Sequence, residues 1–482
     1  MTRAASMRRG PARGAVLLAA ISLALAEDNG KAITPPLGWR NWNQYQCGIS
    51  SSIMEATFRV LATYAAPIWN GSSKTLLQLG YSDAGLDDCY QACGSYGPEK
   101  YTYHDPANNL WPAIDPVKFP GNMSTMTAVA HSLGLTVGFY ANNCACADHC
   151  KDPACFAADV DFIIAMGFDG VKLDGCGKEE RVEIWRDLLN FSSPKPILIE
   201  NCHNGPNEPS RDAQGTLWCP FHQYRSSTDI RPVFGSILAN LQSIPPLAAA
   251  NLSVPGCWAY PDSACTRHFL SSDSPAPALA SALGFCCGLL LRRRPPPPSL
   301  SPLLAVLEVG VTNTQDATQV PLNHSEARAH FGAWAIVSAP LVLGLNLTDA
   351  PTLAGVWDII TNTEAIAVNQ EYAGASGTIF YSSADQTAFA PCGWWLPNCT
   401  FPTQQFLYKP LSGGDVAVLL MNNGVAPADI QLTLASIPGW TAGGAAVRDI
   451  WAHSTLPPVR GALTAKAVGA RDSVFFRLTP QA

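Results

Sequence analysis

The stretch GFDGVKLDGCG, residues 167–177, decides the fold. It is an apolar run bounded by glycines, as in a buried β-strand, yet Lys172 and Asp174 place opposite charges near its end. Residues two apart on a strand point to the same face. The stretch therefore predicts a strand that ends in a charged pair facing one side.

Seven other runs of this kind occur along the chain, and each is followed by a segment with apolar residues at helical spacing. The runs begin at Pro35, Tyr81, Leu135, Pro196, Gln223, Ser253 and Ala335. Among the helix-like segments are residues 123–134, 155–167, 179–189 and 325–335. Eight strand-then-helix units predict an α/β fold, a (β/α)8 TIM barrel.

In a TIM barrel the carboxyl ends of the strands meet at one mouth, where the active site forms. Polar and aromatic residues stand at the predicted strand ends: Trp42, Asp87, Asp88, Tyr140, Asp174, Cys202, His203, Asp229 and Asp262. Lys172 and Asp174 would face this mouth together. The alternative is a structural ion pair without function, since buried pairs of that kind also occur.

A second carboxylate is expected across the mouth from Asp174. Asp229 ends a strand two units later, with Arg225 four residues before it. Glycoside hydrolysis needs such a pair, because one acid attacks or activates water and the other protonates the departing oxygen. We expect Lys172 to keep Asp174 ionised, and desolvation beside Asp174 to favour a proton on Asp229.

Two further regions differ from the barrel pattern. After Gly374 the runs alternate and are separated by turn residues, so residues 375–482 are predicted to form an antiparallel β-sandwich. Within the predicted barrel, residues 27–374, the segment 263–306 contains three arginines followed by four prolines and fits neither pattern. We interpret it as a foreign insert, such as a translated intron, because AYPD (259–262) and LEVGV (307–311) would join smoothly without it.

The N-terminus resembles a secretory signal. Residues 1–26 supply four arginines, a short apolar core and the small-x-small site Ala24-Leu25-Ala26. The core is shorter than the roughly 20 residues that span a bilayer, which disfavours a membrane anchor. Removing the four arginines takes the formal net charge from −7 to −11, which disfavours nucleic acid as a partner. Extracellular space, cell wall, vacuole and lysosome all remain open.

Cysteine content and sequons fit an exported glycoprotein. The chain has 16 cysteines, most of which should form disulfides in an oxidising compartment. The cluster CACADHCKDPAC, residues 144–155, suggests zinc as an alternative, but its spacing fits no C-x2-C pair. Seven N-x-S/T sequons begin at Asn70, Asn122, Asn190, Asn251, Asn323, Asn346 and Asn398.

Six motifs in order resemble the α-galactosidase (melibiase) group, glycoside hydrolase family 27. They are TPPLGWRNWNQYQC (34–47), GLDDCY (85–90), GLTVGFYANN (134–143), GVKLDGC (170–176), YRSSTDI (224–230) and PGCWAYPD (255–262). The resemblance implies a retaining mechanism with Asp174 as nucleophile and Asp229 as acid/base. In such enzymes the two carboxyl groups lie roughly 5 Å apart. It implies no metal and no organic cofactor.

The resemblance also implies a sugar pocket. Its residues would be Trp42, Asp87, Asp88, Tyr140, Lys172, Arg225 and Asp262. Carboxylates accept hydrogen bonds from sugar hydroxyls, and aromatic rings cover the C–H face of a pyranose. Without the motifs, the two aspartates would be interpreted as a turn-capping pair and the two rings as core residues.

The disulfides implied by the resemblance are Cys47–Cys89, Cys202–Cys219, and Cys176 with Cys144 or Cys146. Each would fasten one loop of the site to another. Thirteen cysteines lie outside residues 263–306, so at least one of them should be free.

The chain departs from the family after Cys202. His203 and Asn204 stand where the family carries Glu and then Trp, and that Glu helps to recognise the 2-hydroxyl of galactose. Imidazole changes both the charge and the donor pattern there. The substrate is therefore an α-galactoside or, as in plant-type members with this motif, a β-L-arabinopyranoside. A catalytically silent sugar-binding protein is the alternative of another class, and the oligomeric state is open.

Overall fold

The eight predicted strands form one sheet in which every pairing is parallel, and this confirms the predicted barrel fold. The structure is a computed structural model that describes residues 27–95, 103–141, 144, 146, 150, 153–175, 179–202, 208–227, 229–262, 307–313, 320–392 and 397–481. The strands are β1 (Leu37–Arg40), β4 (Asp83–Gly85), β7 (Thr136–Ala141), β8 (Gly170–Asp174), β9 (Leu198–Cys202), β12 (Gln223–Arg225), β13 (Trp258–Tyr260) and β14 (Leu341–Leu343). Their order in the sheet is β13-β12-β9-β8-β7-β4-β1-β14.

The last strand returns to the first, because β14 pairs with β1. Leu307 extends the other edge of β14: it forms a parallel bridge with Leu343, and its N–H donates to the carbonyl of Val342 at 2.6 Å. Asp262, two residues after the end of β13, and Leu307 are the two ends of described chain on either side of the predicted insert. The seventh strand position therefore receives residues from both sides of the segment 263–306.

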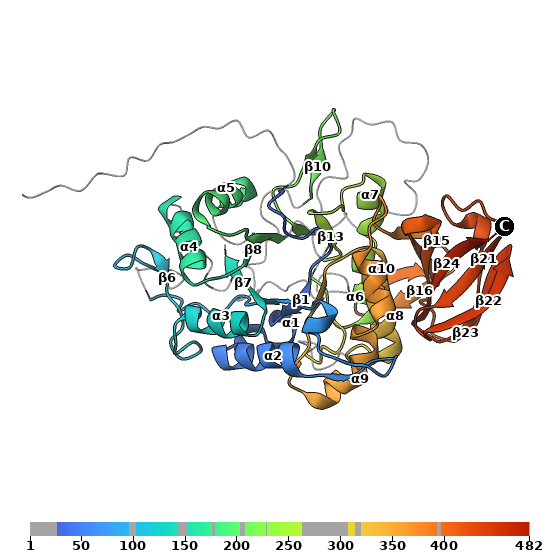
Figure 1. Cartoon of the computed structure of the whole chain (residues 1–482), viewed down its shortest axis with the longest axis horizontal. Coiled ribbons are helices and arrows are strands. Elements are labelled where there is room, and N and C mark those ends of the chain that lie inside the picture. The colour runs from blue at the N-terminus through green and yellow to red at the C-terminus, as the bar shows by residue number, and fades with distance from the viewer. Residues whose placement is uncertain are drawn as a thin grey trace, which may run out of the picture.

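Ten helices surround the barrel strands in the described residues (Figure 1). They are α1 (Trp42–Tyr45), α2 (Ser51–Thr63), α3 (Met123–Ser132), α4 (Pro153–Ala165), α5 (Val182–Ser192), α6 (Phe234–Leu241), α7 (Ile244–Ala249), α8 (His324–Ile336), α9 (Ala350–Ile360) and α10 (Thr363–Gln370). Asn323 begins α8 with a capping box, in which its side chain accepts from the N–H of Glu326. None of these helices is long and apolar enough to cross a membrane.

Three small two-stranded sheets in the barrel domain were not predicted. They pair β2 (Ala66–Pro67) with β3 (Ser73–Lys74), β5 (His104–Asp105) with β6 (Trp111–Pro112), and β10 (Ser210–Arg211) with β11 (Leu217–Trp218). Two-residue strands carry no readable alternation, so the sequence gives no signal for them. The predicted signal, residues 1–26, and the predicted insert, residues 263–306, lie outside the described residues.

The C-terminal domain is antiparallel, as predicted. Its six-stranded sheet has the order β15-β18-β19-β24-β21-β22, and β20–β23 and β16–β17 form two further pairs. The strands are β15 (Thr378–Ser382), β16 (Gln386–Phe389), β17 (Cys399–Pro402), β18 (Gln404–Pro410), β19 (Val416–Asn422), β20 (Ala428–Thr433), β21 (Gly444–Asp449), β22 (Ser454–Arg460), β23 (Ala462–Val468) and β24 (Asp472–Gln481). The predicted domain boundary near residue 374 falls between α10 and β15.

Strand β19 connects the two domains through its two faces. Val418 and Leu420 belong to the core shared with β20 and β23, whereas Leu419 and Met421 belong to the core shared with the barrel helices. Alternate residues of a strand face opposite sides, so one strand serves both cores. The helix α8 packs against this second face, and Gly332 permits the contact, because a Cβ there would lie 2.8 Å from Leu419. Figure 1 shows the β domain beside α8 and α10.

Candidate active site

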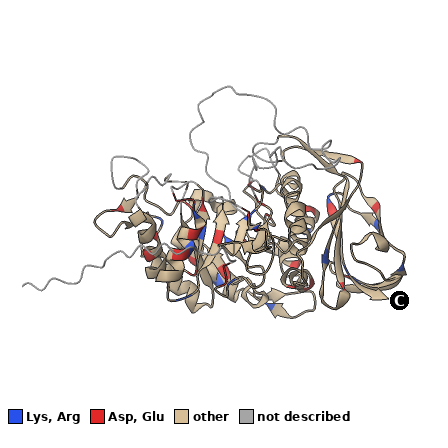
Figure 2. Ribbon diagram, turned by 90° about the horizontal axis from the view of Figure 1, so that it is seen from above, with Lys and Arg blue, Asp and Glu red and all other residues tan. Residues whose placement is uncertain are grey.

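Four side chains from neighbouring strands share one level of the barrel. The register pairs Tyr140 with Lys172, Lys172 with Glu200, and Glu200 with Gln223. Partners in register point to the same side of a sheet. The level therefore runs across β7, β8, β9 and β12, with Asp174 two residues beyond Lys172 toward the strand end. Charged segments adjoin one another among these strands (Figure 2).

Lys172 is fully buried and lies between two carboxylates. Its Nζ is 3.5 Å from Asp87 Oδ2 and 3.8 Å from Glu200 Oε1. Burial lowers the pKa of Lys172, but Asp87, Cys202 and Glu200 outweigh burial, so the pKa stands above its ordinary value. The lysine therefore favours its charged form, and its two ion pairs involve Asp87 and Glu200.

Asp174 ends β8 and is 3% exposed. The Tyr140 hydroxyl donates to its Oδ2 at 2.6 Å, and the N–H of Gly175 donates to its Oδ1 at 2.7 Å. Burial raises the pKa of Asp174 above its ordinary value, although Lys172, Arg225 and Tyr140 act against it. Lys172 thus lowers the pKa of Asp174, the direction expected for it, but burial is the larger effect and the lysine is shared with Asp87 and Glu200.

Arg225, the last residue of β12, contacts three side chains of the site. Its Nη2 pairs with Asp229 and lies 3.1 Å from Asp262 Oδ1, while its Nη1 donates to Cys202 Sγ at 2.8 Å. Burial and the charge of Asp229 raise the pKa of Asp262 well above its ordinary value, and Arg225 opposes them. The same guanidinium acts electrostatically on Asp174. Arg225 thus links the two predicted catalytic acids and Asp262.

Asp87, Asp88 and Trp42 line the adjoining strands. Asp87 and Asp88 are fully buried after β4, and burial raises the pKa of Asp87 despite Lys172. Asp88 Oδ1 accepts from the N–H of Cys89, and its Oδ2 accepts from the N–H of Cys144. Asp88 therefore also caps a turn and holds a neighbouring loop. Trp42 is buried at the start of α1, and its indole N–H has no partner among the described residues. His203 lies outside the described residues.

Glu200 is the residue that sequence reasoning missed. It is 1% exposed in the middle of β9 and contacts Arg40 at 2.8 Å, Gln223 at 2.7 Å and the Tyr260 hydroxyl at 2.8 Å. Burial raises its pKa, but Arg40 and Lys172 outweigh burial, so the pKa lies below its ordinary value. Glu200 therefore ties its own strand to four others, β1, β8, β12 and β13, beneath the site. The sequence contained a signal for this residue, because a glutamate within an apolar run such as PILIENC is expected to be buried, and buried glutamates are almost always paired.

Arg40 reaches Glu200 because its neighbour on β4 has no side chain. A Cβ at Gly85 would overlap the Arg40 guanidinium. Arg40 also lies 3.6 Å from Asp83. Replacement of Gly85 by a larger residue would therefore displace the arginine.

Glu200→Gln is expected to destabilise the protein by about 3 kcal/mol at neutral pH, because removal of one partner leaves Arg40 and Lys172 undercompensated in the interior. Urea unfolding measures this loss. The glutamate pKa is lowered in the fold, so its contribution is present above the ordinary pKa and lost as the pH falls through the folded value. The difference in the free energy of unfolding between the wild-type protein and Glu200→Gln should therefore become smaller at acid pH.

Glu55→Gln is the matched control, because Glu55 pairs with Arg59 at 3.1 Å on an exposed part of α2. Such a pair contributes about 0–1 kcal/mol. Equal losses in the two variants would show that Glu200 is no more than another charged residue.

The cysteines agree with the predicted disulfides in part. Cys47–Cys89 is confirmed, but Cys219 pairs with Cys257 rather than with Cys202. Cys202 is the free cysteine among the described residues, and its sulfur is instead held by Arg225. The prediction failed because Cys257, just before β13, lies within 6.3 Å of Cys219 by Cα. Cys144 is disulfide-bonded, whereas Cys176 lies outside the described residues.

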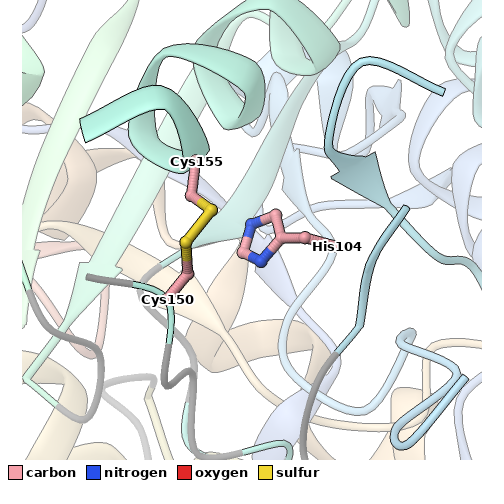
Figure 3. A group of neighbouring side chains, drawn as sticks. All are labelled: His104, Cys150 and Cys155. Carbon is pink, nitrogen blue, oxygen red and sulfur yellow. A yellow bond between two sulfur atoms is a disulfide. The ribbon is translucent and has the colours of Figure 1, made fainter. Parts of the chain in front are cut away.

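The zinc alternative for residues 144–155 is not supported by the cysteines that the structure describes. Cys93 pairs with Cys146, and Cys150 pairs with Cys155. His104 lies beside the second disulfide (Figure 3), so the three residues come close enough to suggest a metal site. Sulfurs joined in a disulfide are not thiolates, which are the form that binds zinc. His104 also lies 3.2 Å from Asp159.

The sequence of this chain matches two known family models. The family model described as "Alpha galactosidase A" matches residues 34–274, and the model described as "Alpha galactosidase C-terminal beta sandwich domain" matches residues 402–478. An alpha-galactosidase from Coffea arabica is 27% identical over 465 residues, which cover 94% of this chain and 96% of that protein. The two matched models correspond to the barrel and to the β domain.

Solved structures show the same fold. Alpha-galactosidase I from Mortierella vinacea has a TM-score of 0.67 at 20% identity and covers 95% of this chain and 99% of its own. A family 27 β-L-arabinopyranosidase from Geobacillus stearothermophilus, solved in complex with arabinose, has a TM-score of 0.64 at 16% identity and covers 94% and 98%. At these identities the structural likeness establishes the architecture. The substrate has to be inferred from the residues of the site.

Proposed function

This chain belongs to the α-galactosidase (melibiase) family, glycoside hydrolase family 27, and from that premise we propose that it hydrolyses terminal α-D-galactosides with retention of configuration. Asp174 is the proposed nucleophile and Asp229 the proposed acid/base. Trp42, Asp87, Asp88, Tyr140, Lys172, His203, Arg225 and Asp262 are the proposed sugar-binding residues.

One observation carries the proposal: buried polar atoms at the strand ends lack hydrogen-bond partners within the described part of the chain. They are Trp42 Nε1, which has no hydrogen-bond partner there, and Lys172 Nζ and Asp87 Oδ2, which form a 3.5 Å ion pair with each other but no hydrogen bond. An unsatisfied buried polar atom costs about 1–3 kcal/mol, so such groups are normally paired. A polyhydroxylated ligand supplies both donors and acceptors to these atoms. Trp42 and Asp87 follow β1 and β4, and Lys172 lies on β8 two residues before its end, a placement that fits a sugar held across the mouth.

The proposed chemistry uses the two acids in turn. The Asp174 carboxylate attacks the anomeric carbon while Asp229 gives a proton to the leaving oxygen, which breaks the glycosidic bond. The sugar is then bound covalently to Asp174. Asp229 next removes a proton from water, the water oxygen attacks the anomeric carbon, and Asp174 is released. Tyr140 holds the Asp174 carboxyl in place through the 2.6 Å hydrogen bond.

β-L-Arabinopyranoside is the second candidate substrate. His203 replaces the family's glutamate, and the structural neighbour from Geobacillus stearothermophilus is an arabinopyranosidase. The arabinopyranose ring is galactose without its hydroxymethyl arm, so the same two acids serve both substrates. Residues 1–26 are the proposed signal for entry into the secretory pathway, which leads to the extracellular space, the cell wall, a vacuole or a lysosome.

A panel of p-nitrophenyl glycosides tests the proposal. We expect a higher kcat/KM on the α-galactoside than on the β-L-arabinopyranoside. The reverse order would reassign the substrate while leaving the mechanism intact. Binding of galactose or arabinose without turnover of either glycoside would instead identify a silent sugar-binding protein.

A further inference from the structure

A groove runs along the contact between the barrel and the β domain. Its volume is about 640 Å³, which falls within the range of ligand pockets, roughly 300–1,000 Å³. Both domains and two barrel segments contribute to its walls. The residues used below are Val233, Phe234, Val320, Pro321, Phe389 and Arg471.

The groove borders the mouth of the barrel. In this fold each helix follows the carboxyl end of a strand, so helices begin at the mouth. Val233 immediately precedes α6, and Val320 lies shortly before α8. Asp229 is four residues before Val233, so their Cα atoms are at most about 14 Å apart. The groove therefore starts beside the loop that carries the proposed acid.

That loop is fixed at several points. Asp229 pairs with Arg225, the N–H of Ile230 donates to Asp262 Oδ1 at 2.9 Å, and the N–H of Arg231 donates to Ser236 Oγ at 3.1 Å. The first two contacts belong to the site, and the third belongs to α6. The relative positions of the acid and the groove are therefore held by the fold.

The groove combines apolar surface with a fixed hydrogen-bond donor. The Arg471 guanidinium lies 5.5 Å from the centre of the Phe389 ring, and its Nη1 pairs with Glu326 Oε1 at 2.9 Å. Arginine has five N–H donors, so donors remain for a ligand. Arg471 also has a φ of 52°, a left-handed conformation that favours glycine. A stacked arginine beside apolar side chains suits sugar rings, which present C–H faces and hydroxyl edges.

We propose that this groove is an aglycone subsite, which binds the sugars attached to the galactosyl group in an oligosaccharide substrate. The inference rests on the proposed function. Asp229 protonates the leaving oxygen, so the aglycone departs on the side of Asp229, which is where the groove begins. The β domain then takes part in substrate selection, because it supplies Phe389 and Arg471.

Two substrates with the same galactosyl group test the inference on the full-length protein. Raffinose carries a disaccharide aglycone, and p-nitrophenyl α-galactoside carries a small aryl group. Arg471→Ala should lower kcat/KM for raffinose by about 10-fold, the effect of losing one charge-assisted hydrogen bond. The aryl substrate should change by no more than about twofold, since its leaving group is a single ring, shorter than a disaccharide, that offers Arg471 no hydroxyl. The protein is deglycosylated first, because the sequon residue Asn323 also lines the groove.

Val320→Arg provides a second variant that should fold normally, because Val320 is 80% exposed. Its bulk should obstruct the groove and lower raffinose cleavage selectively. Phe191→Arg is the matched control: Phe191 is 92% exposed near the C-terminal end of α5, away from the mouth. An unchanged ratio of the two kcat/KM values in both groove variants, or equal losses on both substrates, overturns the inference. A wild-type protein that cleaves neither substrate contradicts the proposed function and this inference with it.

Discussion

Asp174→Asn is expected to lower kcat/KM on p-nitrophenyl α-galactoside by about 10³-fold or more, because an amide cannot form the glycosyl ester. Stability should not fall. Burial raises the pKa of Asp174, so the folded protein bears the cost of a desolvated carboxylate at neutral pH, and the neutral amide removes it. Activity and urea unfolding on the same preparation separate the two effects. Near-normal turnover would contradict the assignment of the nucleophile.

Glycine variants with added azide distinguish the roles of the two acids. In Asp174→Gly, azide can attack the anomeric carbon from the nucleophile's side and should yield the β-galactosyl azide. In Asp229→Gly, azide should intercept the covalent intermediate and yield the α-azide. The opposite pairing of variant and product would exchange the two assignments. These products are resolved by proton NMR.

The second large effect is expected when one methionine, the residue that the family usually carries after the aspartate, replaces residues 263–306. Closure of a 44-residue loop costs about 3 kcal/mol more than a direct connection, so stability should rise by about that amount. Activity should rise as well, because Asp262 stands at the junction and small displacements in a site can cost about 10²-fold in rate.

Both sides of this junction are already packed. Asp262 is 1% exposed and bound to Arg225, while Leu307 bonds to β14 and Glu308 is fully buried. Burial raises the pKa of Glu308 well above its ordinary value, and the charge of Asp262 acts in the same direction. Lower stability or lower activity in the shortened protein would show that the segment is an integral part of the fold. Sequencing of the transcript tests independently whether the segment is translated.

The barrel could be predicted because its strands carry two signals in the sequence, an apolar run and a polar or reactive residue at the end of that run. β8 and β9 are apolar runs of buried residues, and each ends in a residue with a polar or reactive side chain, Asp174 or Cys202. In the β domain, β18 and β24 are short runs with polar residues among the apolar ones, whereas all seven residues of β19 are buried because its two faces serve two cores. The end of the barrel that carries the site could also be predicted from the fold, because parallel strands in a barrel all end at one mouth.

The network of ion pairs and hydrogen bonds around the site was harder to predict, since it depends on which side chains from different strands come into contact. Lys172 was assigned to Asp174 because they are close in sequence, but across the barrel it also meets Asp87 and Glu200. Cys219 was assigned to Cys202 by resemblance, whereas the chain offers Cys257 as a nearer partner. Spacing along the sequence shows which residues share a face of a strand. It does not show that one lysine pairs with several carboxylates from other strands.

The two-sided packing of β19 has a practical consequence. A truncated protein that ended at residue 374 would lose Leu419 and Met421, and α8 would then present to water the small apolar side that Gly332 leaves open for close contact. Exposed patches of that kind promote aggregation. Heating the intact chain should accordingly give one calorimetric transition, and attempts to express the catalytic half by itself should yield insoluble material.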